Sequence, residues 1–265
     1  MVHQRQQLPR RAPPDAEPAD RTPARAAPAG AAPAAPLPPR IRGLLPDVGA
    51  PVSAPSIAGV TFRLAESAAD RAAVLRLRDA VYVQDQARLH DATDTEETFD
   101  RFDPYAHYIL ALDDGEPVGT VKVIPDQEAG LPCEDVVDLS ALRPGNRLVE
   151  FGHLMTLPAI RSRSVGLALM REALVHSVRR FGATHVVGDF FVDENSGQLR
   201  DFYLEIGFVA LGEPYLDERF AGGPLSLVAY LDVPDAVARS RTPEGRRSRL
   251  LQYFFADYHA YASAR

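Results

Sequence analysis

A basic turn in the second half of the chain has the composition of an anion-binding site. Arg161 and Arg163 lead into Ser164-Val165-Gly166-Leu167-Ala168, and apolar residues then recur with helical spacing. The first N–H groups of a helix lack partners within it, and the helix dipole makes this end positive, so both features favour a phosphate. Gly166 has no Cβ and allows a close approach to the backbone. We therefore expect the two arginines to pair with phosphate oxygens at this turn.

The segments around this turn predict an α+β fold. Asp114-Gly115 indicates a hairpin, Ser67 a helix start and Gly182 a helix end. Apolar periodicity predicts strands at 60–64, 107–113, 117–124, 148–157, 184–191, 208–216 and 225–232, helices at 67–84, 165–181, 196–206 and 243–263, and irregular links at 85–104 and 126–147. This order is typical of a mixed, mostly antiparallel sheet flanked by helices.

The composition of the chain changes near residue 55. Residues 1–55 hold 13 of the 23 prolines together with seven arginines. Such a segment buries too little apolar surface to offset the entropy of ordering, so we expect a disordered leader. Residues 56–235 are expected to form one folded domain. Residues 236–265 are expected to be a C-terminal helical extension whose aromatic side chains pack on the sheet, with lining of an acyl tunnel and dimerisation as the alternatives.

Charge and cysteine content exclude several functions. The net charge is −7, and the leader is positive, so the acidic remainder argues against a nucleic-acid partner. Cys133 is the only cysteine, which excludes an intramolecular disulfide and a Cys-based zinc site. The acidic residues from 91 to 100 match no metal-ligand spacing, so no metal is expected. The absence of a long apolar run and of a secretion signal predicts a cytoplasmic protein without a membrane span.

Three motifs together resemble the GCN5-related N-acetyltransferase (GNAT) superfamily. The hexapeptide 163–168 matches the superfamily's R/Q-x-x-G-x-G/A signature, which holds the pyrophosphate of acyl-CoA. Residues 202–208 resemble its F-Y-x-x-x-G-F motif, and Asn195 lies where members often carry an asparagine. Residues 119–122 resemble the strand that precedes the central one. The resemblance implies the acetyltransferase (GNAT) fold for residues 56–235.

Further residues resemble the long-chain branch of this superfamily, which includes N-acyl amino acid synthases, ornithine acyltransferases and acyl-homoserine-lactone synthases. They are Arg78-x-x-Val81-Tyr82, Phe102-Asp103, Val149-Glu150-Phe151-Gly152-His153, Phe208-x-x-Leu211-Gly212 and Gly222-Gly223-Pro224. Two departures argue against a strict lactone synthase: His153 stands where the branch usually has arginine, and the chain has no tryptophan.

The resemblance implies an N-acyltransferase that moves an acetyl or longer acyl group to the amine of a small molecule. The donor is expected to be acyl-CoA, such as acetyl-CoA, or an acyl carrier protein, and the amine attacks it directly in a ternary complex. Donor binding is expected from Met155, Thr156, Arg161, Arg163, Ser164, Val165, Gly166, Leu167, Ala168 and Asn195.

The resemblance also implies catalytic roles. Glu150 lies where the family places its base, and a carboxylate in a semi-apolar strand has a raised pKa suited to accepting a proton. His153 is the alternative base, because a bulge in the strand would turn both side chains to the cleft. A backbone N–H near Met155 or Thr156 would meet the carbonyl oxygen. Tyr203 would protonate the departing thiolate.

Several alternatives stay open. Asp189, Asp193 and Glu194 are candidates for binding the acceptor amine, or they form a solvated acidic loop. A long-chain signal or lipid synthase that uses acyl carrier protein fits the same motifs, and so does a non-catalytic CoA-binding module. The sequence specifies neither the acceptor, nor the acyl chain length, nor the oligomeric state.

Overall fold

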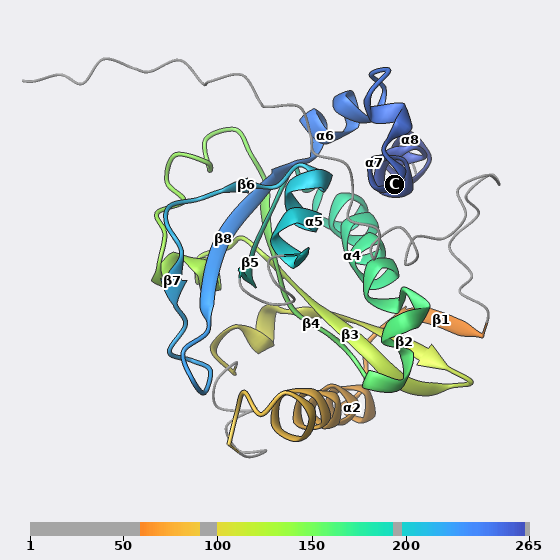
Figure 1. Ribbon diagram of the computed structural model, residues 1–265, viewed down its shortest axis with the longest axis vertical. Helices are drawn as coiled ribbons and strands as arrows, with labels where there is room; N and C mark the ends of the chain where they lie inside the picture. Colours follow the sequence, from red (N-terminus) through yellow and green to blue (C-terminus); the bar gives the residue numbers. More distant parts are fainter. Residues whose placement is uncertain (1–58, 91–99, 193–197, 263–265) are drawn as a thin grey trace, which may run out of the picture. The chain divides into compact units, whose positions relative to one another are not determined.

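The structure is a computed structural model that describes residues 59–90, 100–192 and 198–262. In this part of the chain, eight strands form one sheet in the order β1-β2-β3-β4-β5-β8-β6, and β7 also pairs with β8 (Figure 1). The strands are β1 Val60–Leu64, β2 His107–Asp113, β3 Glu116–Pro125, β4 Leu148–Thr156, β5 His185–Phe191, β6 Val209–Ala210, β7 Tyr215–Leu216 and β8 Leu225–Asp232. The leader predicted for residues 1–55 lies outside the described residues.

Helical segments connect and cover these strands. They are α2 Ala68–Arg78, η1 Asp79–Asp85, η2 Asp100–Tyr105, η3 Pro132–Asp135, η4 Pro158–Arg163, α4 Val165–Phe181, α5 Gln198–Ile206, α6 Val233–Ser240, η6 Gly245–Arg247, α7 Arg249–Phe255 and α8 Tyr258–Ala262. The expected α+β arrangement, the hairpin at Asp114-Gly115 and the helix end at Gly182 are confirmed. No helix among the described residues combines the length and apolarity needed to cross a bilayer.

The sheet is antiparallel except where β4 pairs with β5. These two strands run parallel, and their pairing extends only from Leu148 opposite His185 to Phe151 opposite Gly188. Both strands continue beyond that point, so they diverge at their carboxyl ends. The divergence opens the middle of the sheet (Figure 1).

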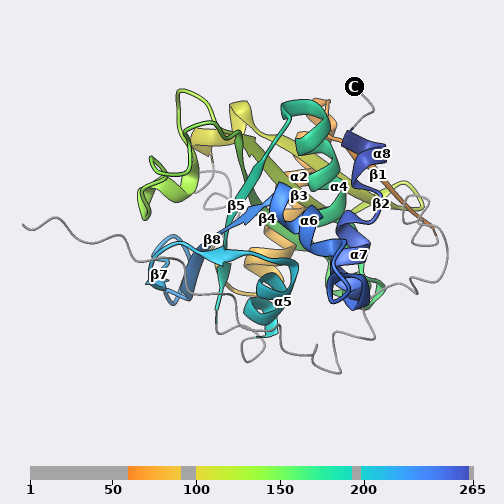
Figure 2. The same cartoon turned by 90° about the horizontal axis from the view of Figure 1, so that it is seen from above.

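The two faces of the sheet are covered by different elements. On one face, α4 buries Val165, Leu169 and Ala173 against the inward side chains of β3, β4 and β5. The opposite face is covered by α2 and by the segment between β3 and β4, whose Leu131 and Leu139 are buried there. Figure 1 shows α2 and α4 on opposite sides of the sheet, and Figure 2 shows the same arrangement from above.

The expected helix at 67–84 consists of two different helices. Ser67 caps α2 in a capping box with Asp70, as the sequence predicted. From Asp79 to Asp85 the chain widens into a π-helix, η1. π-helical turns are rare and occur often at functional sites. This one carries Tyr82, whose ring is buried beneath the central strand.

Two expectations about the second half of the chain are wrong. The strand predicted at 208–216 is two short strands, because Gly212 has a φ of 79° and turns the chain between them. The single helix predicted at 243–263 is divided into η6, α7 and α8, and an unpredicted helix, α6, precedes it. Asp232 caps α6 and Ser248 caps α7 through side-chain hydrogen bonds, so each cap starts a new helix.

The aromatic C-terminal helices contact α4 and belong to the core cluster that α4 forms with the sheet. Arg171 of α4 is buried, and its Nε donates to the carbonyl oxygen of Tyr253 at 2.9 Å. Its Nη2 lies 2.6 Å from a carboxylate oxygen of Asp257. This buried arginine ties α7 and the following turn to the helix that carries the anion-binding turn.

Candidate active site

The central strand β4 contains a bulge at His153. Thr120 of β3 pairs with Met155 and Lys122 pairs with Gly152, so Val121 lies opposite both His153 and Leu154. The backbone of His153 has a φ of 50°, which is uncommon for a residue with a side chain. A bulge adds one residue and re-aims the side chains beside it. The expected bulge in this strand is therefore present, but it lies at His153 and Leu154, beyond the regularly paired stretch that holds Glu150, so it does not turn both side chains to the cleft as predicted.

Two cavities meet where β4 and β5 diverge. The smaller has a volume of about 50 Å³ and extends between the two strands toward α4. The larger has a volume of about 250 Å³ and reaches toward η1 and the segment before β8. Both cavities are lined by His153, Leu154, Asp189, Phe190 and Tyr203. These five residues mark the junction at which two ligands would meet.

The register of β3 and β4 determines which backbone N–H groups face this junction. Leu157 donates to the carbonyl oxygen of Val118 at 2.9 Å, and Met155 is paired with Thr120. In an antiparallel ladder, hydrogen-bonded pairs alternate with pairs that are not hydrogen-bonded. The N–H of Thr156 therefore points away from β3, toward the opening left by β5. Of the two predicted oxyanion donors, Thr156 has the suitable direction and Met155 is used in the ladder.

The basic turn is followed by a helix start at the predicted place. Ser164 adopts a left-handed conformation with a φ of 58°, and α4 begins at Val165. The N–H groups of Val165, Gly166 and Leu167 belong to the first helical turn, and Ala168 donates to Ser164 at 3.1 Å. A Cβ on Gly166 would meet only Thr156 Cγ2, at 3.9 Å. The backbone at Gly166 is therefore not crowded by neighbouring side chains.

The two arginines of the turn are paired with carboxylates. Arg163 Nη1 lies 2.5 Å from Asp113 Oδ2, and Arg161 Nη2 lies 2.5 Å from Asp85 Oδ2. The hydrogen bond to Asp113 is the main reason that the pKa of Arg163 is raised. Both guanidinium groups are more than one-third exposed. Their predicted contact with a phosphate remains a prediction and requires that they leave these partners.

His153 is a neutral imidazole at the junction. Burial holds its pKa well below the usual range, and the positive charges of Arg78, Lys122 and Arg219 act in the same direction. The ring of Tyr82 packs edge-on against it, with the centroids 6.1 Å apart. A neutral imidazole has one ring nitrogen that accepts a hydrogen bond, and the lowered pKa makes this ring a weaker base than an exposed histidine.

Glu150 occupies a different environment from His153. Its side chain is 3% exposed, and its Oε2 accepts a hydrogen bond from the backbone N–H of Cys133 at 2.9 Å. Burial, followed by the negative charge of Asp189, raises the pKa of Glu150 to about 8. Glu150 does not line either of the two cavities. It joins the central strand to the segment between β3 and β4.

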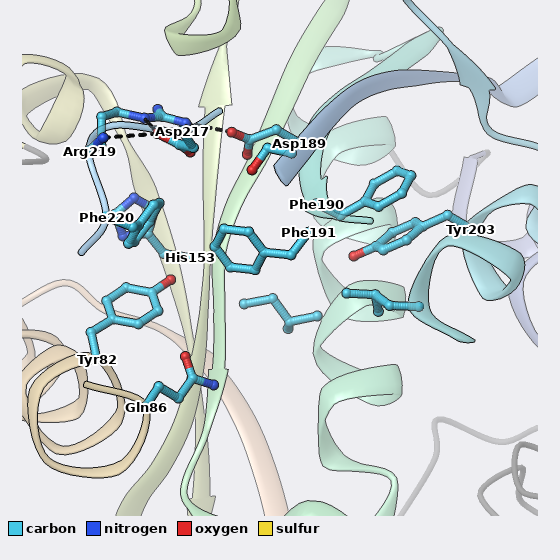
Figure 3. A pocket seen from close by; sticks show the side chains of 13 residues that line it. Tyr82, Gln86, His153, Asp189, Phe190, Phe191, Tyr203, Asp217, Arg219 and Phe220 are labelled. Carbon is cyan, nitrogen blue, oxygen red and sulfur yellow. Dashed lines mark hydrogen bonds and ion pairs between the residues drawn. The ribbon is translucent and has the colours of Figure 1, made fainter. Parts of the chain in front are cut away.

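Tyr203 reaches the junction from α5. Its ring stacks on Phe190 with a centroid distance of 4.4 Å and meets Phe208 edge-on at 5.1 Å. These contacts fix the ring, and its hydroxyl points into the larger cavity (Figure 3). The Tyr82 hydroxyl points inward from the opposite wall (Figure 3).

A polar network at the wall of the larger cavity was not predicted in full. Arg219 Nη2 lies 2.6 Å from Asp189 Oδ2 and 2.7 Å from Asp217 Oδ2. Tyr215 donates its hydroxyl hydrogen to Asp189 Oδ2 at 3.0 Å. Asp189 was a candidate from the sequence, but its partners lie in and after a segment interpreted as strand. No sequence motif marks Tyr215 or Arg219 as site residues, because they approach β5 only after the chain turns at Gly212.

A buried ionic cluster supports the other wall. Arg78 is fully buried, and its Nη1 and Nη2 each lie 3.2 Å from oxygens of Asp103. Lys122 and the Tyr108 hydroxyl also bind Asp103. Arg78 is the last residue of α2. The cluster therefore fixes the position at which η1, the helix that carries Tyr82, begins. The resemblance motifs at Arg78, Phe102-Asp103 and Lys122 thus meet in one place.

Three residues predicted for the site, Asn195, Asp193 and Glu194, lie outside the described residues. Among the residues that are described, no group of three or more histidine, cysteine, aspartate or glutamate side chains is arranged to hold a metal ion.

Comparison with known proteins relates this site to a family. The family model described as N-acyl amino acid synthase FeeM matches residues 73–230. The solved structure of FeeM, an N-acyl amino acid synthase from uncultured soil microbes, is 20% identical with a TM-score of 0.58 and covers 71% of this chain and 98% of that one. An acyl-CoA N-acyltransferase from Pseudomonas aeruginosa is 20% identical with a TM-score of 0.46 and covers 64% of this chain and 98% of that one. No curated protein matches the chain.

Proposed function

Because the chain belongs to the family of the N-acyl amino acid synthase FeeM, within the GNAT superfamily, and is an N-acyltransferase, we propose that its acceptor is an amino acid. The donor in this proposal is an acyl thioester of phosphopantetheine, carried by CoA or by an acyl carrier protein. The observation that carries the proposal is the junction of two cavities, because acyl transfer requires a donor and an acceptor to meet at one atom.

The donor is assigned to the gap between β4 and β5. Its phosphates would lie on the N–H groups of Val165, Gly166 and Leu167, where the helix end is positive and Gly166 leaves room. The pantetheine arm would then follow β4 through the smaller cavity to the junction. The anion-binding turn favours CoA as the donor, and the phosphopantetheine of a carrier protein fits the same path. The larger cavity is left for the acceptor.

The reaction forms one bond and breaks one. The amine nitrogen attacks the thioester carbon, the C–N bond forms, and the C–S bond breaks with its electron pair going to sulfur. Starting from the ammonium form, two protons leave the nitrogen, of which one ends on the thiol and one in solvent. The N–H of Thr156 is directed to receive the carbonyl oxygen as its negative charge develops.

His153 and Tyr203 are proposed for the two proton transfers. His153 is proposed to accept the amine proton because it lines both cavities and its ring is neutral, although its lowered pKa makes it a weak base before the acceptor binds. Tyr203 lines both cavities with a hydroxyl that donates to the leaving thiolate. Glu150, the first candidate for the base, is assigned instead a positioning role through its hydrogen bond to Cys133.

The proposal is tested by measuring thiol release together with product mass. Acetyl-CoA, decanoyl-CoA and decanoyl acyl carrier protein are each offered with a pool of the common amino acids. Formation of an N-acyl amino acid that is reduced in Tyr203→Phe supports the proposal. Turnover with the two decanoyl donors alone identifies a long-chain synthase. CoA binding without turnover of any donor would instead favour a non-catalytic CoA-binding module.

A further inference from the structure

We propose that Asp189 and Arg219 form a clamp for the two charges of an α-amino acid, with the ammonium on Asp189 Oδ1 and the carboxylate on Arg219 Nη1. This inference rests on the proposed function and deepens it, because it assigns the recognition of the acceptor to two named atoms. It also selects α-amino acids over simple amines and amino acid amides.

The first argument is that Arg219 is held rigidly but is not saturated. Asp217 is buried, and its two carboxylate oxygens accept from Arg219 Nε at 2.8 Å and Nη2 at 2.7 Å. Asp189 and Tyr215 also contact Nη2. Within the described part of the chain, no hydrogen bond of Arg219 uses Nη1. A guanidinium fixed along one edge in this way presents its remaining nitrogen to a carboxylate.

The second argument is that Asp189 is fixed through one oxygen. The contacts from Arg219 at 2.6 Å and Tyr215 at 3.0 Å both end on Oδ2. No hydrogen bond among the described residues ends on Oδ1, and Asp189 lines both cavities. A carboxylate has about four acceptor positions, so Oδ1 is able to receive an ammonium group while Oδ2 keeps its partners.

The third argument is the order of the two groups along the cavities. Asp189 lines both cavities, whereas Arg219 lines only the larger one. An ammonium on Asp189 would therefore lie at the junction, next to His153 and Tyr203. The carboxylate on Arg219 would lie farther from the donor. This order presents the nitrogen, and not the carboxylate, to the thioester.

The net charge of the clamp also selects among acceptors by the charge of their side chains. Asp189 and Asp217 together carry two negative charges and Arg219 one positive charge, so the clamp has a net negative charge before the acceptor binds. An acceptor whose side chain is also negative meets repulsion at short range. Aspartate and glutamate are therefore expected to be poor acceptors, and amino acids with neutral or positive side chains better ones.

The test compares free amino acids with their primary amides, which keep the amine and lose the carboxylate charge. Leucine with leucinamide, and phenylalanine with phenylalaninamide, are assayed with decanoyl-CoA and also titrated calorimetrically into the protein with CoA bound. We expect the free acids to exceed the amides about 10- to 100-fold in kcat/KM and in affinity. Arg219→Gln should reduce this ratio to near one.

Arg143→Gln is the matched control. Arg143 is likewise held by two carboxylates, Asp126 and Glu134, with similar exposure, but it lines neither cavity. It should keep the wild-type ratio. Asp189→Asn should weaken binding of the acids and the amides alike, because both carry the amine.

The outcomes separate the two proposals. Equal kcat/KM and equal affinity of the wild-type protein for acids and amides would overturn the clamp, whether or not Arg219→Gln folds. Turnover in that same assay would leave the proposed function standing. Discrimination in the calorimeter without transfer from any donor would support the clamp and reject the proposed function. Discrimination that survives in Arg219→Gln also overturns the clamp.

Discussion

The guanidinium of Arg163, which lies just before the first turn of α4, is bound to Asp113, at 2.5 Å from Nη1 to Oδ2. The pair is partly exposed, with 35% of the arginine side chain and 26% of the aspartate side chain accessible. Such exposed pairs contribute only about 0–1 kcal/mol. A phosphate would therefore be able to compete with Asp113 for Arg163.

Asp113→Asn is predicted to improve donor binding. Without the charge of Asp113, the competition for Arg163 is weaker and a donor phosphate pairs with it more readily, so the KM for acyl-CoA should fall about 2- to 5-fold, in keeping with the weakness of an exposed ion pair. Arg163→Ala should raise the same KM about 10-fold. The measurement is steady-state thiol release with varied acyl-CoA. If Arg163→Ala has the wild-type KM, Arg163 is only a structural partner of Asp113.

Gly166→Ala is predicted to separate stability from donor binding. Alanine is favoured over glycine in a helix by about 1 kcal/mol, and the added Cβ meets no atom closer than 3.9 Å, so the melting temperature should stay the same or rise. The same methyl group would occupy the space assigned to the phosphates. We expect the KM for acyl-CoA to increase at least about 10-fold, a loss of about 1.4 kcal/mol. Unchanged donor binding would show that no phosphate approaches this backbone.

The sequence predicted those parts of the fold whose signals are local. Strands β1 to β5, the capping box at Ser67 and the glycine end of α4 follow from periodicity and from single residues with known conformational preferences. The start of α4 at the basic turn was also predicted, because its signal lies within six residues, while anion binding there stays a prediction. The extents of β6 and β7 were missed, since two-residue strands have no periodicity to detect.

The candidate site could be predicted only in part, for a related reason. His153 and Tyr203 belong to motifs, and both reach the junction. The partners of Asp189 come from a segment after Gly212 that returns to β5 only in three dimensions. The side-chain direction of Glu150 depends on the segment between β3 and β4, which has no pattern that reveals where it packs. The sequence therefore indicated which residues belong to the candidate site, but it did not indicate which side chains pair with one another across the sheet.

His153→Gln and Glu150→Gln are predicted to affect the rate differently. If His153 accepts the amine proton, its replacement should lower kcat about 100-fold or more, while Glu150→Gln should lower it only a few-fold. The pH profile gives an independent reading. A base with the pKa of Glu150, about 8, would make kcat rise nearly tenfold per pH unit from pH 6 to 7.5. That slope should be absent from the wild-type protein if His153 is the base.

The opposite result would restore Glu150 as the base. A rising limb near pH 8 in the wild-type protein that disappears in Glu150→Gln, at saturating acceptor, would assign the proton transfer to the carboxylate. Circular dichroism of both variants confirms that the comparison is between folded proteins.

Glu150→Gln is also predicted to change how stability depends on pH. The pKa of Glu150 is about 8 in the folded protein and near 4.5 when unfolded, so between these values the folded state binds more protons. The contribution of Glu150 to the free energy of unfolding therefore falls as pH rises from about 4.5 to about 8. Glutamine cannot ionise and still accepts the hydrogen bond from Cys133. The variant should gain stability relative to wild type by up to about 1.4 kcal/mol per pH unit in this window.

Denaturant titrations at pH 5.5, 7 and 8.5 measure this difference. Other titrating groups contribute equally to both proteins, so they cancel when one curve is subtracted from the other. A difference that is constant across the three pH values would mean that Glu150 is ionised in the folded protein throughout.

Gly119→Ala and Gly152→Ala form a pair of substitutions on neighbouring strands with opposite expected effects. A Cβ on Gly119 would lie 2.8 Å from the carbonyl oxygen of Met155 and 3.1 Å from Leu169 Cδ1, so β3 would be pushed from β4 at a cost of about 1–3 kcal/mol. A Cβ on Gly152 would have no neighbour within 4 Å. We expect Gly119→Ala to melt about 2–10 °C below the wild-type protein and Gly152→Ala to melt within about 2 °C of it.

Because Gly152 lines the smaller cavity, the methyl group of Gly152→Ala should raise the KM for acyl-CoA although the fold is intact. Scanning calorimetry and donor kinetics on the same preparations decide the matter, and equal melting temperatures for the two variants would mean that β3 and β4 are not packed as closely as the structure has them.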